Sequence, residues 1–433
     1  MNAAAASLAI AWPSTDALWI MATGAVIAAA CAVLGAFLVL RQMSMMGDAI
    51  SHSVLPGLAA AFLVTQSYSI GPLLLGAVIA GLLTALLTQT LHRFARVPAD
   101  ASMGVVFTSL FALGVVLITQ VKGVHFDKQC VFEGALELAP LYTVQWGSLQ
   151  LPRALAVGLI VLGVNTVALV LLWKEFKLSA FDPALATTMG FPAGVMHYLL
   201  MTLVAVTAVA SFEAVGSILV VAMLITPAAT AHLLVDRLGP MVLLSAAIGA
   251  ASSVLGYALA VHFDTNVAGM MAVAAGGLYG VAVLFSPRYG LLSTMLHNAR
   301  LALRVIRDDL LGMLYRLEEL GAERRLASRD ARTAIGGGLL AWWGLASLQR
   351  NELVSRAGET LELTPAGRDA ARQLVRAHRL WENYLVQFLG LPLDHVHEPA
   401  HRVEHYLDSG LQQSLRQKLD DANVDPHGRE IPE

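Results

Sequence analysis

The chain has 433 residues, of which 57% are hydrophobic and only 14% are charged. Because about a quarter of the residues of a soluble globular protein are charged, this composition excludes an ordinary soluble protein and indicates a chain that mostly faces lipid. The formal net charge of −3 favours no class of charged partner, and the two cysteines, Cys31 and Cys130, form no CxxC pattern and indicate no disulfide framework.

The charged residues are unevenly distributed along the chain. Residues 1–290 contain 10 Lys/Arg and 11 Asp/Glu, whereas residues 291–433 contain 18 and 20. This change predicts a membrane domain over residues 1–290, a linker over 291–304 and a water-exposed domain over 305–433. No basic segment precedes the first apolar stretch, so we expect no cleaved signal peptide.

Nine apolar stretches come near the roughly 20 residues that a transmembrane helix needs. Lys and Arg are enriched in the loops on the cytoplasmic side of a membrane protein. With the N-terminus outside, seven loop Lys/Arg fall inside, and three, Lys122, Lys128 and Arg153, fall outside. We therefore expect a multi-pass membrane protein with its C-terminal domain in the cytoplasm. The expected spans are roughly 17–40, 49–66, 70–91, 102–120, 154–173, 195–213, 216–235, 240–262 and 267–285.

An acidic and a basic side chain lie where the chain enters the second expected span, Asp48 just before it and His52 in its first turn. Ionisable residues within spans are costly and usually functional. The two residues are four positions apart, so a helix places them on one face, and a carboxylate with a neutral imidazole suits Mn²⁺, Fe²⁺ or Zn²⁺. The alternative is structural, with Asp48 capping the span after Gly47 and His52 hydrogen-bonding a neighbouring helix.

A short helix is predicted in the loop between the fifth and sixth spans. Asp182 is a good N-cap and Pro183 a good first-turn residue, so the helix should run from Pro183 to about Met189 and end at Gly190. By its local pattern alone, this segment is an ordinary helix between two spans.

The last third of the chain changes to amphipathic segments, such as DDLLGMLYRLEELG (308–321). Thr364 and Pro365 then predict the start of another amphipathic helix. Two groups of ligand-type residues follow at helical spacing, so they form either a metal site or a solvated pair of charged helices. They are His378 and Glu382 at i, i+4, and His397, His401, Glu404 and His405 at i, i+4, i+7 and i+8.

Three segments resemble the signature of the permease subunits of zinc, manganese and iron ABC importers. The segments are RQMSMMGDAISHSVLPGLAAAFL (41–63), FDPALATTMGFP (181–192) and SFEAVGSILVVAMLITPAATAHLL (211–234), and the resemblance covers about residues 16–290. It implies a permease of the bacterial inner membrane, to which an extracellular metal-binding protein delivers a divalent metal. It further implies that Asp48 and His52 form the metal site in the pore, and that a separate cytoplasmic ATPase powers transport.

The same resemblance implies that the loop helix is a coupling helix that docks in a groove of the ATPase, through Asp182, Pro183, Ala184 and Gly190. The chain has no G-x-x-x-x-G-K-[ST] motif, so it carries no P-loop ATPase site of its own and is not expected to be an enzyme. A second copy of the chain or a sister permease would complete the pore.

Residues 305–430 resemble the diphtheria-toxin-repressor class of iron- and manganese-dependent regulators. The matching segments are LYRLEELG, LTPAGRDAA, AHRLWE, VHEPAHRVEH and DPHGREIP. The resemblance implies a winged-helix unit followed by a helical metal-binding unit. It places five residues at ligand positions, while His401 stands where iron-type members keep Cys, which leaves the metal open. The five are His378, Glu382, His397, Glu404 and His405.

The expected DNA-recognition helix corresponds to AIGGGLLAWWGLASLQRNELV (334–354). Gly336, Gly337 and Gly338 would weaken a helix, and apolar residues occupy 339–343, where polar side chains would have to reach base edges. DNA binding is therefore not expected, and this surface is expected to pack against something else.

Together these patterns predict an all-α polytopic membrane protein with about nine transmembrane helices, followed by a cytoplasmic α+β winged-helix and helical metal-binding domain. The expected function is import of manganese, zinc or iron as a permease subunit, with a metal-sensing domain that takes the same divalent ions. Two alternatives remain open: a membrane-tethered, metal-dependent transcription regulator, and a metal transporter that needs no ATPase.

Overall fold

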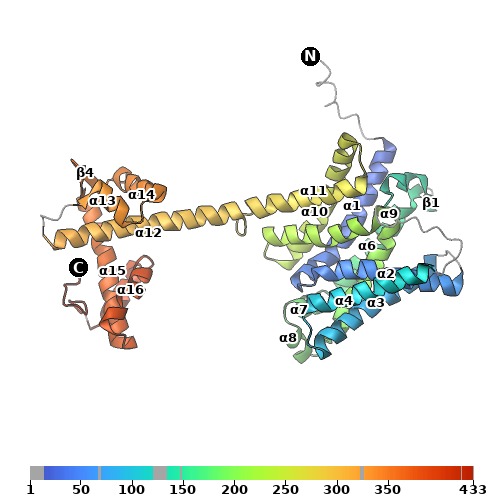
Figure 1. The fold of residues 1–433 in the computed structure, drawn as a ribbon, viewed down its shortest axis with the longest axis horizontal. Helices are drawn as coiled ribbons and strands as arrows, with labels where there is room; N and C mark the ends of the chain where they lie inside the picture. The colour runs from blue at the N-terminus through green and yellow to red at the C-terminus, as the bar shows by residue number, and fades with distance from the viewer. Residues whose placement is uncertain are drawn as a thin grey trace, which may run out of the picture. The chain divides into compact units, whose positions relative to one another are not determined.

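The computed structural model describes residues 14–66, 70–119, 134–146, 149–321, 326–420 and 422–432. The chain forms two compact units, Met1–Ser293 and Thr294–Glu433, and Figure 1 shows their helices and strands. Lys122, Lys128 and Cys130, which entered the sequence analysis, lie outside the described residues.

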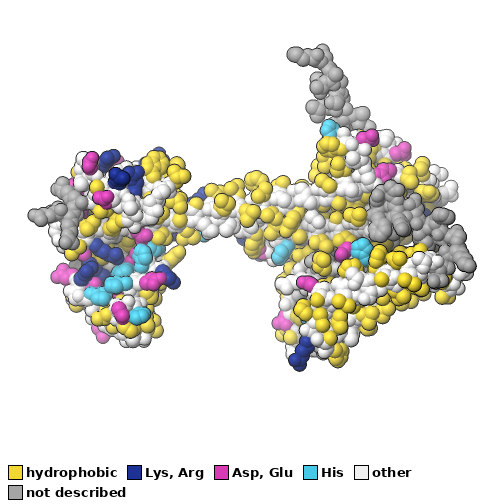
Figure 2. Space-filling view, in the orientation of Figure 1, with side chains coloured by type: hydrophobic (Ala, Val, Ile, Leu, Met, Phe, Trp, Pro, Cys, Tyr) yellow, Lys and Arg dark blue, Asp and Glu magenta, His cyan; other side chains and the backbone are white. Residues whose placement is uncertain are grey.

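The first unit is a bundle of apolar helices, and hydrophobic side chains cover much of the surface seen in Figure 2. Among the described residues, nine helical segments are long and apolar enough to cross a membrane. The nine expected spans are thereby confirmed. Gly216, with φ +72°, interrupts α9, which therefore contributes two of the nine. The spanning helices are α1 (Thr15–Leu40), α2 (Ser44–Thr65), α3 (Ile70–Phe94), α4 (Ala99–Thr119), α6 (Arg153–Leu171), α9 (Ala193–Leu234), α10 (Leu238–Phe263) and α11 (Val267–Phe285).

Glycines let the helices of this bundle approach closely. α1 packs on α6, α9 and α10, and a Cβ atom on Gly35 would lie 1.7 Å from the carbonyl oxygen of Leu224 in α9. Gly57 of α2 and Gly76 of α3 meet reciprocally, because a Cβ on either would come within 2.4 Å of the other's carbonyl oxygen. Small residues thus set the spacing between helices, as is common in membrane bundles.

Short elements lie between the spans. Between α4 and α6, the strands β1 and β2 form an antiparallel hairpin that pairs Thr143 with Pro152. Glu137 Oε1 accepts a hydrogen bond of 2.6 Å from the amide of Val267, the first residue of α11. This contact satisfies one of the backbone N–H groups that have no partner within the helix. The short elements are η2 (Leu136–Leu141), β1 (Thr143–Trp146) and β2 (Leu149–Pro152), with α7 (Trp173–Phe181) and α8 (Pro183–Thr188) between α6 and α9.

The second unit is a three-stranded winged-helix unit followed by helices, as expected for the C-terminal domain. Residues 291–304 belong to the continuous helix α12. The elements in order are α12 (Leu291–Glu319), β3 (Leu326–Ala327), α13 (Ser328–Ala334), α14 (Gly338–Arg350), β4 (Val354–Ala357), β5 (Thr360–Leu363), α15 (Pro365–Leu389), η3 (Leu393–His395), α16 (His397–Glu404) and α17 (Ser409–Lys418).

The strands of the second unit are antiparallel in the order β3-β5-β4. Leucines of α12, α14 and β5, including Leu310, Leu348 and Leu361, form the core against which this small sheet packs. α15 begins at its expected signal, because the Thr364 hydroxyl accepts a 3.0 Å hydrogen bond from the amide of Gly367, and Pro365 occupies the first turn. The core and the cap together fix α15, which carries the first pair of expected ligands.

Ion pairs and hydrogen bonds hold the C-terminal residues against α15. Arg379 makes a double ion pair with Glu319 of α12 and lies 3.6 Å from Asp425, and both Arg379 and Asp425 are buried. Asn383 donates a hydrogen bond of 2.7 Å to the carbonyl oxygen of Val424. These contacts hold the DPHGRE loop close to the helices that carry the expected ligands.

Candidate metal sites

Asp48 and His52, the expected pore pair, lie in the second and third turns of α2. His52 Nε2 is 3.3 Å from Asp48 Oδ1, and each side chain is about 30% exposed. Asp48 does not cap the helix, because α2 begins at Ser44 with Met43 at the N-cap position. The alternative that the sequence left open, in which Asp48 caps the span, is therefore wrong. Both side chains are available on one face of the helix.

Neighbouring helices fix the position of α2. In addition to the contact between glycines, the Thr84 hydroxyl of α3 donates a 2.6 Å hydrogen bond to the hydroxyl of Ser53. On the other side, the rings of Phe107 and Phe111 in α4 lie 6.0 and 5.8 Å from the His52 imidazole, centre to centre. The imidazole is thus packed against two aromatic rings of α4 while its Nε2 faces Asp48.

The loop helix α8 forms as expected. The Asp182 side chain accepts a 2.9 Å hydrogen bond from the amide of Leu185, and Pro183 occupies the first turn. Beyond the end of the helix, Gly190 has φ +88°, which L side chains rarely adopt, so a glycine is suited to this position. Ala184 is exposed within α8.

The six expected ligands of the C-terminal unit fall into two clusters. The first contains His378 and Glu382 from α15 and His397 from the start of α16. Glu382 Oε1 lies 2.9 Å from His378 Nε2 and 2.5 Å from His397 Nδ1. The His397 ring also stacks on the ring of His427, with centres 4.6 Å apart. The DPHGRE loop, which carries His427, therefore covers this cluster on one side.

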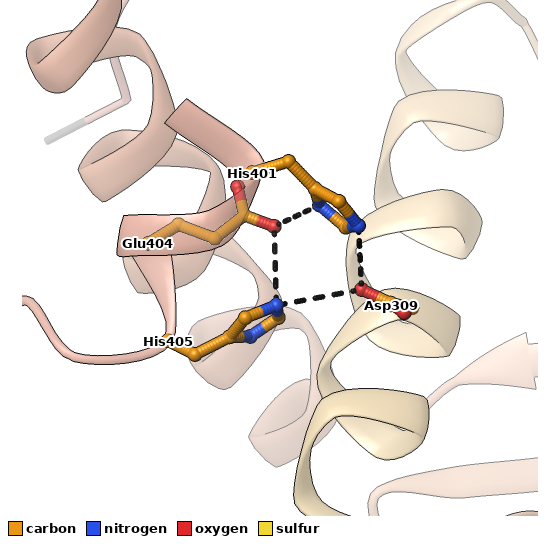
Figure 3. A group of neighbouring side chains, drawn as sticks. All are labelled: Asp309, His401, Glu404 and His405. Atoms are coloured by element: carbon orange, nitrogen blue, oxygen red, sulfur yellow. Dashed lines mark hydrogen bonds and ion pairs between the residues drawn. The ribbon is translucent and has the colours of Figure 1, made fainter. Parts of the chain in front are cut away.

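The second cluster contains His401, Glu404 and His405 from α16, together with Asp309 from α12. Figure 3 shows the four side chains pointing toward one another. Asp309 Oδ1 lies 3.6 Å from His401 Nε2 and 3.7 Å from His405 Nε2, while Glu404 Oε1 lies 2.9 Å from His401 Nδ1. The sequence analysis missed Asp309. Its signal was the acidic pair 308–309 on the amphipathic helix.

Glu404 joins the two clusters. Its Oε2 lies 2.5 Å from His378 Nδ1, while its Oε1 faces His401. His378 therefore presents Nε2 to the first cluster and Nδ1 to a carboxylate of the second. A carboxylate behind a ligand imidazole orients the ring and raises its basicity, so the two clusters are chemically coupled.

Burial and partner charges shift the pKa values in the clusters. Burial lowers the pKa of His378, but hydrogen bonds to Glu382 and Glu404 outweigh it, so the pKa is raised. Burial likewise raises the pKa of both carboxyls, but the contacts with His378 outweigh it and lower the pKa of each. At Asp309, burial outweighs the attraction of His401 and His405, so the pKa of this carboxyl is raised. The raised pKa of His378 and the lowered pKa of the two carboxyls both favour the charged forms that attract one another.

The clusters fit divalent metal ions. Within the described residues, Glu382 Oε1, Asp309 Oδ1 and His405 Nε2 are buried atoms that have no partner in hydrogen-bond geometry, although polar atoms lie near each of them. Buried polar groups are rarely left in this way, and a metal ion would satisfy all three. Imidazole and carboxylate donors suit Mn²⁺, Fe²⁺ or Zn²⁺.

Two family models match this chain, one in each unit. The sequence model of the ABC 3 transport family matches residues 16–286, and that of the iron dependent repressor, metal binding and dimerisation domain, matches residues 364–433. The chain is 45% identical to the manganese transport system membrane protein MntD of Bacillus subtilis (strain 168), over 65% of this chain and 95% of that protein.

The zinc transport system membrane protein TroD of Treponema pallidum (strain Nichols) is 36% identical, over 78% of this chain and 97% of its own length. A solved structure, PsaBC from Streptococcus pneumoniae in complex with Fab, is similar with a TM-score of 0.55 and 30% identity, covering 65% of this chain and 96% of that one. Both resemblances drawn from the sequence are confirmed. The chain belongs to the ABC 3 transport family and carries an iron-dependent-repressor metal binding and dimerisation domain at its C-terminal end.

Proposed function

We propose that this chain is the permease subunit of a bacterial importer that moves Mn²⁺, Zn²⁺ or Fe²⁺ into the cytoplasm. The observation that carries the proposal is the pair formed by Asp48 and His52, a carboxylate and an imidazole 3.3 Å apart within an apolar span. The manganese and zinc transport proteins among its relatives support a divalent metal as the substrate.

The pair serves as a transient stop for the ion. Two ligands replace part of the hydration that the ion loses in the pore, whereas a complete cage would hold it too tightly for conduction. Packing against Phe107 and Phe111 limits the rotation of the His52 ring. The ring therefore keeps one nitrogen directed at Asp48 and at an ion held between them.

Radiometal uptake by cells tests this role. Asp48→Ala and His52→Ala should each abolish uptake while leaving the protein inserted and assembled. Asp264→Ala and His262→Ala are matched controls, because they also remove a carboxylate and an imidazole, and these exposed residues lie at the end of α10 and not on α2. Near-normal uptake by both pore variants would reduce the pair to a structural contact.

A separate cytoplasmic ATPase drives transport, and α8 is the element that docks with it. The exposed side chains of Leu185 and Met189, on and just after α8, give this short helix an apolar surface that suits a groove on a partner. An extracellular metal-binding protein delivers the ion on the opposite side. A second permease, either this chain or a sister subunit, completes the pore. The repressor-type dimerisation domain favours a second copy of this chain.

The C-terminal unit senses imported metal in the cytoplasm. The first cluster joins α15 to α16 and the second joins α12 to α16, so ions bound in both clusters draw the three helices together. A preformed cage rarely exists without its metal, so binding and closure are coupled. We infer feedback inhibition, in which the closed unit favours a resting state of the transporter. By linkage, the state of the transporter must then alter the metal affinity of the unit.

The test compares ATP-driven uptake by the full chain and by a His397→Ala/His405→Ala variant at rising internal metal. One ligand is removed from each cluster. Inhibition that appears in the native protein and vanishes in the variant supports the sensor. Identical curves would mean that the unit stores or delivers metal, while the permease assignment would stand.

A further inference from the structure

The helix α14 exposes four large apolar side chains near its N-terminal end. Leu339 is 78%, Trp343 56%, Trp342 50% and Leu340 42% exposed. The opposite face of α14 forms the core contact of the helix through Ala341, Gly344, Leu345 and Leu348. Apolar residues therefore surround the first turns, and those on the outer face contribute nothing to the core of the unit.

The backbone before α14 leaves this face uncovered. Gly336, Gly337 and Gly338 have φ values of +87°, +65° and +76°, and a Cβ on any of them would meet no atom within 4 Å. The three glycines turn the chain into α14 without placing any side chain beside the two tryptophans. The rings of Trp342 and Trp343 touch each other edge to face, with centres 5.4 Å apart. The result is an apolar tip on a water-exposed unit, which marks an interaction surface.

A cavity of about 400 Å³ with mostly polar lining lies beside this tip. Arg329, Arg332 and Arg356 line it together with Trp342, and Glu359 is the acidic residue that also lines it. Hydrogen bonds from the Nε atoms of Arg332 and Arg356 to backbone carbonyls hold those two guanidinium groups in place. The cavity is therefore positively charged and bordered by an indole ring.

We propose that this face docks on the anionic surface of the bilayer that the first unit spans. The tip formed by Leu339, Leu340, Trp342 and Trp343 enters the lipid interface, and the arginine cavity receives the phosphate of a lipid headgroup. Tryptophan is enriched at membrane interfaces because its amphipathic ring suits the headgroup level. Guanidinium groups bind phosphate through several parallel hydrogen bonds.

Two further observations favour the bilayer over other occupants. The unit is covalently continuous with a chain of nine spans, so docking on that bilayer is intramolecular and occurs at high effective concentration. DNA is disfavoured because the residues at the start of α14 offer leucine side chains and indoles instead of the donors and acceptors that read base edges. The proposal does not depend on the transport function or on metal sensing.

Spin labelling of the full chain in nanodiscs tests the proposal. Cys31 and Cys130 are replaced by Ala, and a nitroxide is attached at Leu339→Cys. The control label is at Gln387→Cys on α15, which is exposed and polar. The nanodiscs contain either phosphatidylcholine alone or phosphatidylcholine with 30% phosphatidylglycerol. Accessibility to oxygen and to a water-soluble nickel complex then reports whether each label lies in lipid or in water.

In nanodiscs with phosphatidylglycerol, the 339 label should gain oxygen access and lose nickel access, while the 387 label stays accessible to nickel. The shift should be lost in phosphatidylcholine alone, in an Arg329→Gln/Arg332→Gln variant and in a Trp342→Ser/Trp343→Ser variant. A shift that ignores lipid charge would overturn the headgroup site. A 339 label shielded from both reagents in every lipid would assign the face to a protein, such as a second copy, and protection only by added duplex DNA would assign it to nucleic acid.

Discussion

Glu404→Gln should weaken metal binding in both C-terminal clusters, because its two carboxylate oxygens face different clusters. In the second cluster the change removes a carboxylate that faces His401 at 2.9 Å. In the first cluster it removes the carboxylate 2.5 Å behind His378, whose other nitrogen faces Glu382. Asp309→Asn should affect the second cluster alone, because Asp309 belongs to that cluster and not to the first.

The size of the effect follows from these two positions. Loss of a carboxylate behind a ligand imidazole typically lowers metal affinity about 10- to 100-fold, so the first cluster should lose about 1.4–2.8 kcal/mol of binding free energy. The second cluster loses a direct ligand and should fall by at least the same factor. Glu404 is almost completely buried, so solvent screening does not diminish the effect.

Competition with a chelating dye measures both affinities in purified full-length protein. An Asp48→Ala/His52→Ala background removes the pore pair, so the titration reports the C-terminal unit alone. Glu398→Gln is the matched control, because Glu398 lies on the same helix, is exposed and pairs only with Arg402 among the described contacts. Its affinities should equal those of the background protein.

Three outcomes would refute this reasoning. A Glu404→Gln protein in which one metal binds with unchanged affinity would show that the two clusters are independent. An Asp309→Asn protein that loses both metals would show that the coupling does not run through Glu404. Equal losses in Glu404→Gln and Glu398→Gln would reduce the effect to the net charge of the helix.

Three further predictions concern packing, coupling and pH. Gly35→Ala forces α1 and α9 apart and should lower the free energy of unfolding of the bundle by on the order of 3 kcal/mol, which a lower thermal midpoint would show. Gly163→Ala is the control and should leave the midpoint unchanged, because a Cβ at this position would meet no atom within 4 Å. Gly190→Trp, at φ +88°, should uncouple ATP hydrolysis by the partner from metal uptake. Gly194→Trp, in the first turn of α9, is the control and should leave the two coupled. Unchanged hydrolysis and uptake in the Gly190→Trp protein would contradict the coupling role. The pKa of His378 is raised from 6.5, so its protonated form stabilises the metal-free unit fully below pH 6.5 and this contribution disappears as pH rises through the folded-state pKa. The thermal midpoint in chelator should fall over that window in the native protein, and a His378→Gln variant that shows the same fall would contradict the assignment.

Local sequence signals predicted the elements that depend on neighbouring residues. The nine spans follow from apolar length, and the structure has them within a few residues of the expected bounds. Thr364 with Pro365, and Asp182 with Pro183, placed the starts of α15 and α8 through the capping chemistry of their own side chains. The glycines at 336–338 were expected to weaken the recognition helix. In the structure α14 begins at Gly338, so Gly336 and Gly337 precede the helix instead.

The sequence by itself determined which residues could bind metal, because helical periodicity places residues at i and i+4 on one face of one helix. Periodicity carries no information on the distance between helices. Only the tertiary structure divided the six expected ligands into two clusters, added Asp309 from a helix about 90 residues earlier in the chain, and placed Glu404 between His378 and His401. Those contacts depend on how the buried leucines of α12 pack in one core with Ala371 of α15, and on the pairing of Arg379 with Glu319. Such long-range contacts leave no local pattern in the sequence.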